Sequence, residues 1–115
     1  MIDHLAYLQK ARTILLEILQ NQIVEDEFHE SISQLKLVLN SGVRVYIKYN
    51  QFGEYGYQIL HSYEKNDFSR FDNFDDHWDV KSRPHHHHLK GGLEVIQSPM
   101  RGSPENDMPI LVKYL

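Results

Sequence analysis

Residues 35–49 read Leu-Lys-Leu-Val-Leu-Asn-Ser-Gly-Val-Arg-Val-Tyr-Ile-Lys-Tyr, and this stretch decides the fold. Apolar and polar side chains largely alternate on both sides of the Gly-containing turn at 40–42. A period of two is typical of strands with one buried face. Two such runs around a short turn predict a β-hairpin.

The strand pattern extends to both sides of this hairpin. Residues 22–29 predict a polar edge strand, although they could also continue a preceding helix. A third strand follows the turn near Gly53, a fourth covers about 67–73, and residues 93–96 are a candidate for a further short strand. Short connections between consecutive strands are typical of an antiparallel meander. We therefore expect an α+β fold with a sheet of about five strands over roughly residues 22–73.

Two helices are expected at the ends of the chain. Residues 3–20 predict a helix with Asp3 as N-cap, and its apolar stripe predicts packing across one face of the sheet. The stripe consists of Leu5, Leu8, Leu15, Ile18 and Leu19. At the other end, Asp107 is the expected N-cap of a short helix over 107–115, with Pro109 in its first turn.

Length and composition bound the class of protein. The 115 residues predict a single domain, 1–115, with 41% hydrophobic and 24% charged residues. The absence of cysteine excludes disulfide and thiolate chemistry and fits a cytoplasmic protein. No apolar run approaches membrane-spanning length, and no signal-peptide pattern opens the chain. The net charge of −4 argues against coating nucleic acid through bulk charge, but allows an enzyme that engages a short stretch of RNA. A homodimer is compatible with the sequence.

The strongest chemical signal is the run His85–His88, which follows Pro84. An expression tag would lie at a terminus, whereas residues 89–115 follow this run. In an extended backbone, His86 and His88 share one face. Such a pair could act as general base and general acid in transesterification of RNA. It could equally hold a divalent metal, with Asp72 or His77 as a further ligand.

Upstream polar residues extend the candidate site, so residues 70–92 form the expected functional segment. In a strand, Arg70 and Asp72 share a face, where Arg70 could hold a phosphate or simply pair with Asp72 in solvent. Asp72 and Asn73 could orient a histidine or close a turn. Tyr57 belongs to an aromatic sheet surface, in which one or two tyrosines could stack a base or donate a phenolic proton. Trp78, beside His77, could likewise either pack in the fold or stack a base.

The order of these motifs resembles the TumE family, small toxins of bacterial and archaeal toxin–antitoxin modules. The resemblance covers about residues 3–100 and rests on Tyr55-Gly56-Tyr57-Gln58, Arg70-Phe71-Asp72-Asn73 and Pro84-His85-His86-His87-His88. The matching positions are Tyr57, Arg70, Asp72, Asn73, Pro84, His85, His86 and His88, whereas His87 falls on a variable position. Family members often carry a His-His pair after the Asp-Asn, but residues 74–77 here read Phe-Asp-Asp-His, which weakens any role for His77.

The resemblance implies a toxin that is inhibited by a cognate antitoxin, a helix-turn-helix DNA-binding protein. Ribonuclease activity is the usual expectation for such a toxin.

Three hypotheses follow. In the leading one, the protein cleaves RNA without a cofactor: His86 and His88 act as acid and base, and His85 supports them. Arg70 then stabilises phosphate charge, while Asp72 and Asn73 position these groups. In the second hypothesis, the histidine cluster binds a divalent metal and the protein is a metal-dependent hydrolase. In the third, the protein is a non-enzymatic module that binds another protein.

Overall fold

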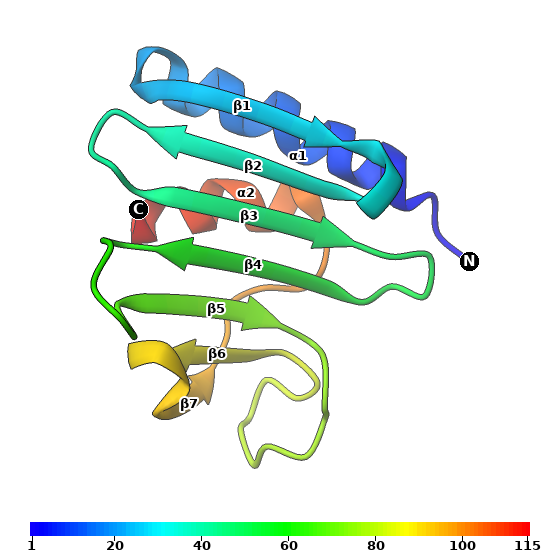
Figure 1. Ribbon diagram of the computed structural model, residues 1–115. Helices are drawn as coiled ribbons and strands as arrows, with labels where there is room; N and C mark the ends of the chain where they lie inside the picture. Colours follow the sequence, from blue (N-terminus) through cyan, green and yellow to red (C-terminus); the bar gives the residue numbers. More distant parts are fainter.

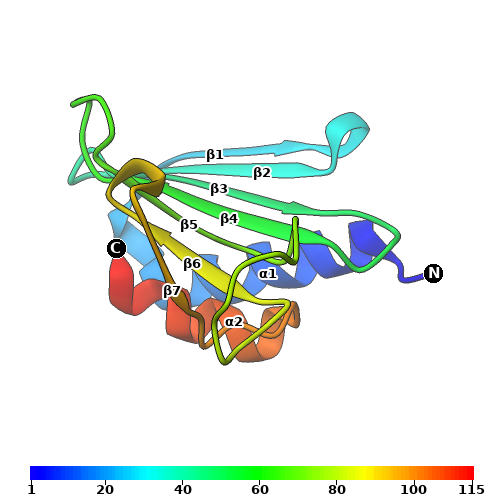
Figure 2. The same ribbon diagram turned by 90° about the horizontal axis from the view of Figure 1, so that it is seen from below.

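The computed structural model describes all 115 residues as one antiparallel sheet with the helices on one of its faces (Figure 1, Figure 2). Seven strands follow one another in sequence order, and every neighbouring pair is antiparallel. The predicted α+β meander is therefore confirmed. The predicted strand number, about five, is too low.

The elements follow one another with short connections, apart from the longer segment 73–85. The helices and strands are α1 (His4–Leu19), β1 (Ile23–His29), β2 (Gln34–Leu39), β3 (Arg44–Tyr49), β4 (Tyr55–Leu60), β5 (Phe68–Asp72), β6 (His86–Leu89), β7 (Glu94–Gln97) and α2 (Pro104–Leu111). Single 3-10 turns cover Gln20–Gln22, Glu30–Ile32, Lys90–Gly92 and Val112–Tyr114.

The hairpin predicted over 35–49 is present as β2 and β3, with Leu35 opposite Ile47 and Leu37 opposite Val45. Residues 23–29 form a strand and do not continue the helix. The strand β7 confirms the candidate short strand at 93–96, with bounds shifted by one residue, so β6 is the strand that lies beyond the expected ones. No strand is predicted at the position of β6, because four consecutive histidines show no apolar alternation that would indicate one.

The core lies between the sheet and the two helices. Asp3 caps α1 as expected, its side chain accepting a hydrogen bond from Ala6 N at 3.0 Å. The buried residues of α1 are Leu8, Ala11, Leu15 and Leu19, one per helical turn. Ile18, expected on this stripe, is 42% exposed, whereas Ala11, which is not part of the predicted stripe, is buried.

The C-terminal helix begins three residues earlier than predicted. α2 starts at Pro104, whose fixed φ and missing N–H suit the first turn of a helix. Asp107 is therefore not the N-cap, and it points inward, where it is fully buried. Its carboxylate accepts hydrogen bonds from the Tyr57 hydroxyl and from the backbone N–H groups of Arg101 and Gly102.

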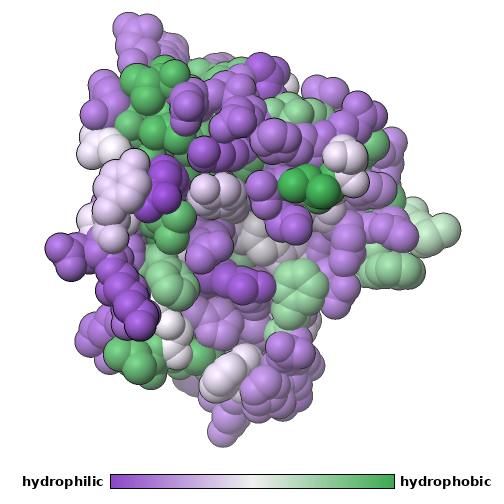
Figure 3. Space-filling view, viewed as in Figure 1, coloured by the Kyte–Doolittle hydropathy of each residue, from purple (hydrophilic) through white to green (hydrophobic).

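No helix covers the other face of the sheet, which is dominated by hydrophilic residues (Figure 3). Neither helix has the length and apolar character needed to cross a membrane. The bare face carries the alternate residues of every strand, including those of β5 and β6 that form the candidate site.

Candidate functional site

The pairing of β5 with β6 assembles the site. Arg70 lies opposite His88, and Asp72 lies opposite His86. Because side chains alternate along each strand, these four residues emerge on the bare face of the sheet. The residues between them, Phe71 and His87, face the helices.

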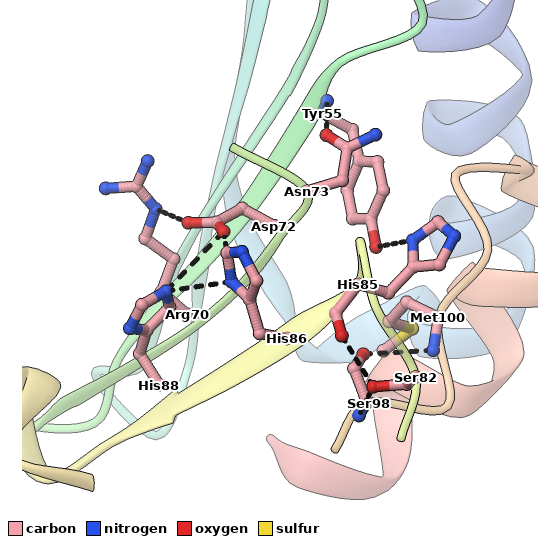
Figure 4. Close-up of polar contacts among 10 residues, drawn as sticks. All are labelled: Tyr55, Arg70, Asp72, Asn73, Ser82, His85, His86, His88, Ser98 and Met100. Atoms are coloured by element: carbon pink, nitrogen blue, oxygen red, sulfur yellow. Dashed lines mark hydrogen bonds and ion pairs between the residues drawn. The ribbon is translucent and has the colours of Figure 1, made fainter. Parts of the chain in front are cut away.

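Asp72 is the centre of the cluster (Figure 4). Its Oδ2 lies 2.7 Å from Nε of Arg70. On the other side, its Oδ1 lies 2.7 Å from Nδ1 of His86 and 3.5 Å from Nε2 of His88. The two imidazole nitrogens are themselves 3.1 Å apart. Three potential metal-ligand atoms, one each from Asp72, His86 and His88, thus lie close together.

The hydrogen bonds within this triangle are incomplete. His86 Nδ1 and His88 Nε2 share one hydrogen bond, and no hydrogen bond of acceptable geometry joins His86 to the carboxylate. Despite its short distance from His86, Oδ1 of Asp72 therefore has no hydrogen-bond partner, although it is buried. Buried carboxylate oxygens without partners are rare in native proteins and point to function or to a missing ligand.

Exposure separates the four residues into two pairs. Asp72 and His86 are almost completely buried, whereas 18% of the His88 side chain and 44% of the Arg70 side chain are exposed. Burial lowers the pKa of His88, and the negative charge of Asp72 opposes this effect only in part. His88 therefore presents a neutral imidazole near neutral pH.

The cluster forms one wall of a pocket of about 290 Å³ that is also lined by Phe74, Trp78 and the Gly91-Gly92 pair. Trp78 packs edge-on against the ring of His88, with 5.7 Å between centroids. A larger hollow of about 810 Å³ covers the bare face and shares Arg70 and Phe74 with this pocket. Of these lining residues the sequence pointed only to Trp78, since a single Phe or a Gly pair in a polar segment gives no distinctive signal.

Two predicted site residues lie beside the cluster but not in it. His85 precedes β6, and its Nδ1 lies 2.8 Å from the Tyr55 hydroxyl, on the core side of the sheet (Figure 4). The side-chain oxygen of Asn73 accepts from Tyr55 N, and its Nδ2 donates to Gly53 O. Both residues therefore hold loops against β4, and Asn73 has the turn role that its residue type favours.

Two further candidates lie elsewhere. Tyr57 is fully buried on the helix side of the sheet, where its hydroxyl contacts Tyr49 and Asp107. His77 is exposed on the 73–85 segment, and its ring lies against Trp78 at a tilt of 33°, outside the group of converging ligand atoms. The structure thus brings together Arg70, Asp72, His86 and His88, and separates Tyr57 and His77 from them.

A meander sheet with one bare face and a histidine–carboxylate cluster on that face defines a small α+β protein whose candidate site is built on its sheet. The model of the family described as Toxin TumE matches residues 10–113. The chain therefore belongs to the TumE family: it is the toxin component of a toxin–antitoxin module, and this membership implies a cognate antitoxin as its partner. Neither the curated proteins nor the solved structures contain a significant match.

Proposed function

We propose that this toxin cleaves RNA at phosphodiester bonds, with the cluster of Arg70, Asp72, His86 and His88 as its active site. The observation that carries the proposal is the buried Asp72 carboxylate, which holds Arg70 on one side and two imidazoles on the other. The Arg70 guanidinium, which suits phosphate binding, and the His88 imidazole, which suits proton transfer, therefore line the same pocket.

Arg70 is suited to binding the phosphate. Asp72 engages its Nε, so the two terminal nitrogens of the guanidinium remain available to the pocket. A planar guanidinium can donate two parallel hydrogen bonds to phosphate oxygens. Because Asp72 fixes the guanidinium in the ground state, little side-chain freedom is lost when a phosphate binds.

The histidine pair acts in this proposal as one unit. The two ring nitrogens are 3.1 Å apart, which leaves no room for a phosphodiester between them. His88, the more exposed ring, takes the 2′-hydroxyl proton through its Nδ1, while His86 and Asp72 hold its Nε2. The 2′-oxygen then attacks phosphorus, and the His88 imidazolium protonates the departing 5′-oxygen. The products are a 2′,3′-cyclic phosphate and a 5′-hydroxyl.

The experiment incubates the purified toxin with RNA and determines the chemical ends of the fragments. We expect cleavage by the wild type, with a loss of at least about 100-fold in His88→Ala, within the usual range for an acid–base group. His77→Ala is the matched control, since it removes a nearby histidine outside the cluster. Undiminished cleavage by His88→Ala, or intact RNA with the wild type, would contradict the proposal.

A metal-dependent hydrolase is the second candidate, and the convergence of three donor atoms favours it. Hydrolysis by water leaves no 2′,3′-cyclic phosphate, so the same analysis of fragment ends distinguishes the two reactions. Cleavage that persists in excess chelator would exclude the metal-dependent route.

A further inference from the structure

We propose that Asp72 Oδ1, His86 Nδ1 and His88 Nε2 are the three protein ligands of one divalent first-row transition-metal ion. Its open coordination positions face the pocket beside Arg70. The inference rests on the metal-dependent candidate function for the nature of the substrate, because a His88 ring that binds an ion through Nε2 carries its proton on Nδ1 and cannot take a further proton there. The binding of the ion does not depend on RNA being that substrate.

The spacing of the three atoms fits a single ion. Their separations are 2.7, 3.1 and 3.5 Å. Ligand atoms at about 2.1 Å from a metal stand roughly 3.0 Å apart at right angles and roughly 3.4 Å apart in a tetrahedron. The observed triangle spans this range, so an ion would require shifts of only a few tenths of an ångström.

The unpaired Asp72 oxygen supplies an independent argument. Asp72 is 3% exposed, and its Oδ1 has no hydrogen-bond partner although it points into the cluster. Only one hydrogen bond connects the three converging atoms. A cation bound to all three would satisfy the carboxylate oxygen and would use the lone pairs of both imidazoles.

The surroundings also fit a metal site. Arg70 fixes the second carboxylate oxygen at 2.7 Å, which is the kind of outer contact that orients a metal ligand. Two imidazoles and one carboxylate favour zinc, iron or manganese over magnesium and calcium, which prefer oxygen ligands. Three protein ligands leave room for water or a phosphate oxygen, and the pocket of about 290 Å³ gives access to that position.

The histidine run could also bind metal without this site, as a flexible tract does. Asp72 separates the two possibilities because it lies on β5, outside the run. A tract of histidines would bind equally well without the carboxylate. His85→Ala removes a histidine from the run without touching the three proposed ligands.

The experiment is a calorimetric titration of chelator-treated protein with Zn²⁺, compared across Asp72→Asn, His88→Ala, and the controls His85→Ala and His77→Ala. We expect one ion per chain for the wild type and for both controls. In Asp72→Asn and His88→Ala we expect affinity to fall by about 100-fold or more, which matches the upper end of losses for outer-shell changes. Zn²⁺ should also raise the melting temperature of the wild type and not that of Asp72→Asn.

Equal affinity of the wild type and Asp72→Asn would overturn the inference, as would the absence of any Zn²⁺ binding. If circular dichroism shows Asp72→Asn to be unfolded, His88→Ala decides, because His88 is the most exposed of the three ligands. RNA cleavage in chelator together with no metal binding would overturn only this inference. Metal binding without RNA cleavage would overturn only the proposed function.

Discussion

Two buried aspartates show how the same residue type takes different roles. Asp107 is fully buried, and its carboxylate accepts four hydrogen bonds, from Tyr57, Arg101, Gly102 and Asn106. Asp72 is nearly as buried, but its Oδ1 has no hydrogen-bond partner, although both imidazoles lie close to it. Since a satisfied carboxylate stabilises a fold and an unsatisfied one costs free energy, the contrast supports a structural role for Asp107 and the proposed functional role of Asp72.

Tyr57→Phe tests this distinction at the residue scale. Burial raises the pKa of Tyr57, so its hydroxyl stays protonated and donates to Asp107 Oδ2 at 2.7 Å. Removing the donor should lower the free energy of unfolding by about 1–3 kcal/mol in chemical denaturation. RNA cleavage well below the melting temperature should be unchanged, since Tyr57 lies across the sheet from the cluster. A folded Tyr57→Phe variant without RNA cleavage would show that Tyr57 takes part in the reaction. The control for stability is Tyr46→Phe, which removes a hydroxyl on the bare face.

At the scale of elements, β6 carries residues of two kinds. His86 and His88 join the cluster, while His87 packs on the opposite face with its ring stacked on Phe71 at 3.9 Å. Its Nε2 is buried without a partner. A run of identical residues is therefore divided by strand alternation into site residues and a core residue.

His87 makes stability depend on pH. Burial lowers its pKa to about 4, whereas an unfolded histidine titrates near 6.5. Between these pH values the unfolded chain binds a proton that the folded chain does not. The free energy of unfolding is therefore highest above about pH 6.5 and decreases as the pH falls toward 4. His87→Phe should remove up to ~3 kcal/mol of this pH dependence in denaturation measured with chelator present. The exposed His29→Gln is the control, and a wild-type-like pH profile in His87→Phe would contradict the assignment.

How far the sequence predicts these elements depends on whether a local pattern exists. The hairpin 35–49 and the start of α1 follow from alternation and from an N-cap, which are local signals. The same-face pair of His86 and His88 also follows from alternation. The strand β6 itself is stabilised by pairing with β5 and β7, and such long-range pairing leaves no mark on a run of histidines. The sequence predicts the wrong role for Asp107, because a turn-forming residue shortly before Pro109 has the features of an N-cap, whereas the buried hydrogen bond with Tyr57 decides its position.

At the scale of the molecule, the helices bury one face of the sheet and leave the other face free. On the bare face, the large hollow leads from Arg70 past Gln58 toward Lys48. Lys36 is paired with Glu27 at 3.4 Å, whereas Lys48 is exposed and makes no ion pair. With a net charge of −4, the protein would hold an RNA chain through a few such cations rather than through a general attraction.

Lys48→Glu tests whether this hollow guides an extended RNA to the cluster. A long single strand that reaches from Arg70 to Lys48 should bind about 3- to 10-fold more weakly, and the slope of log affinity against log salt should fall by about 1. A dinucleotide occupies only the pocket at Arg70, so its cleavage should be unchanged. Lys113→Glu alters the charge identically on the helix side and is the matched control. If Lys48→Glu and Lys113→Glu bind long RNA equally well, the RNA strand does not cross this face. The change in net charge alone would then explain the weaker binding of both variants.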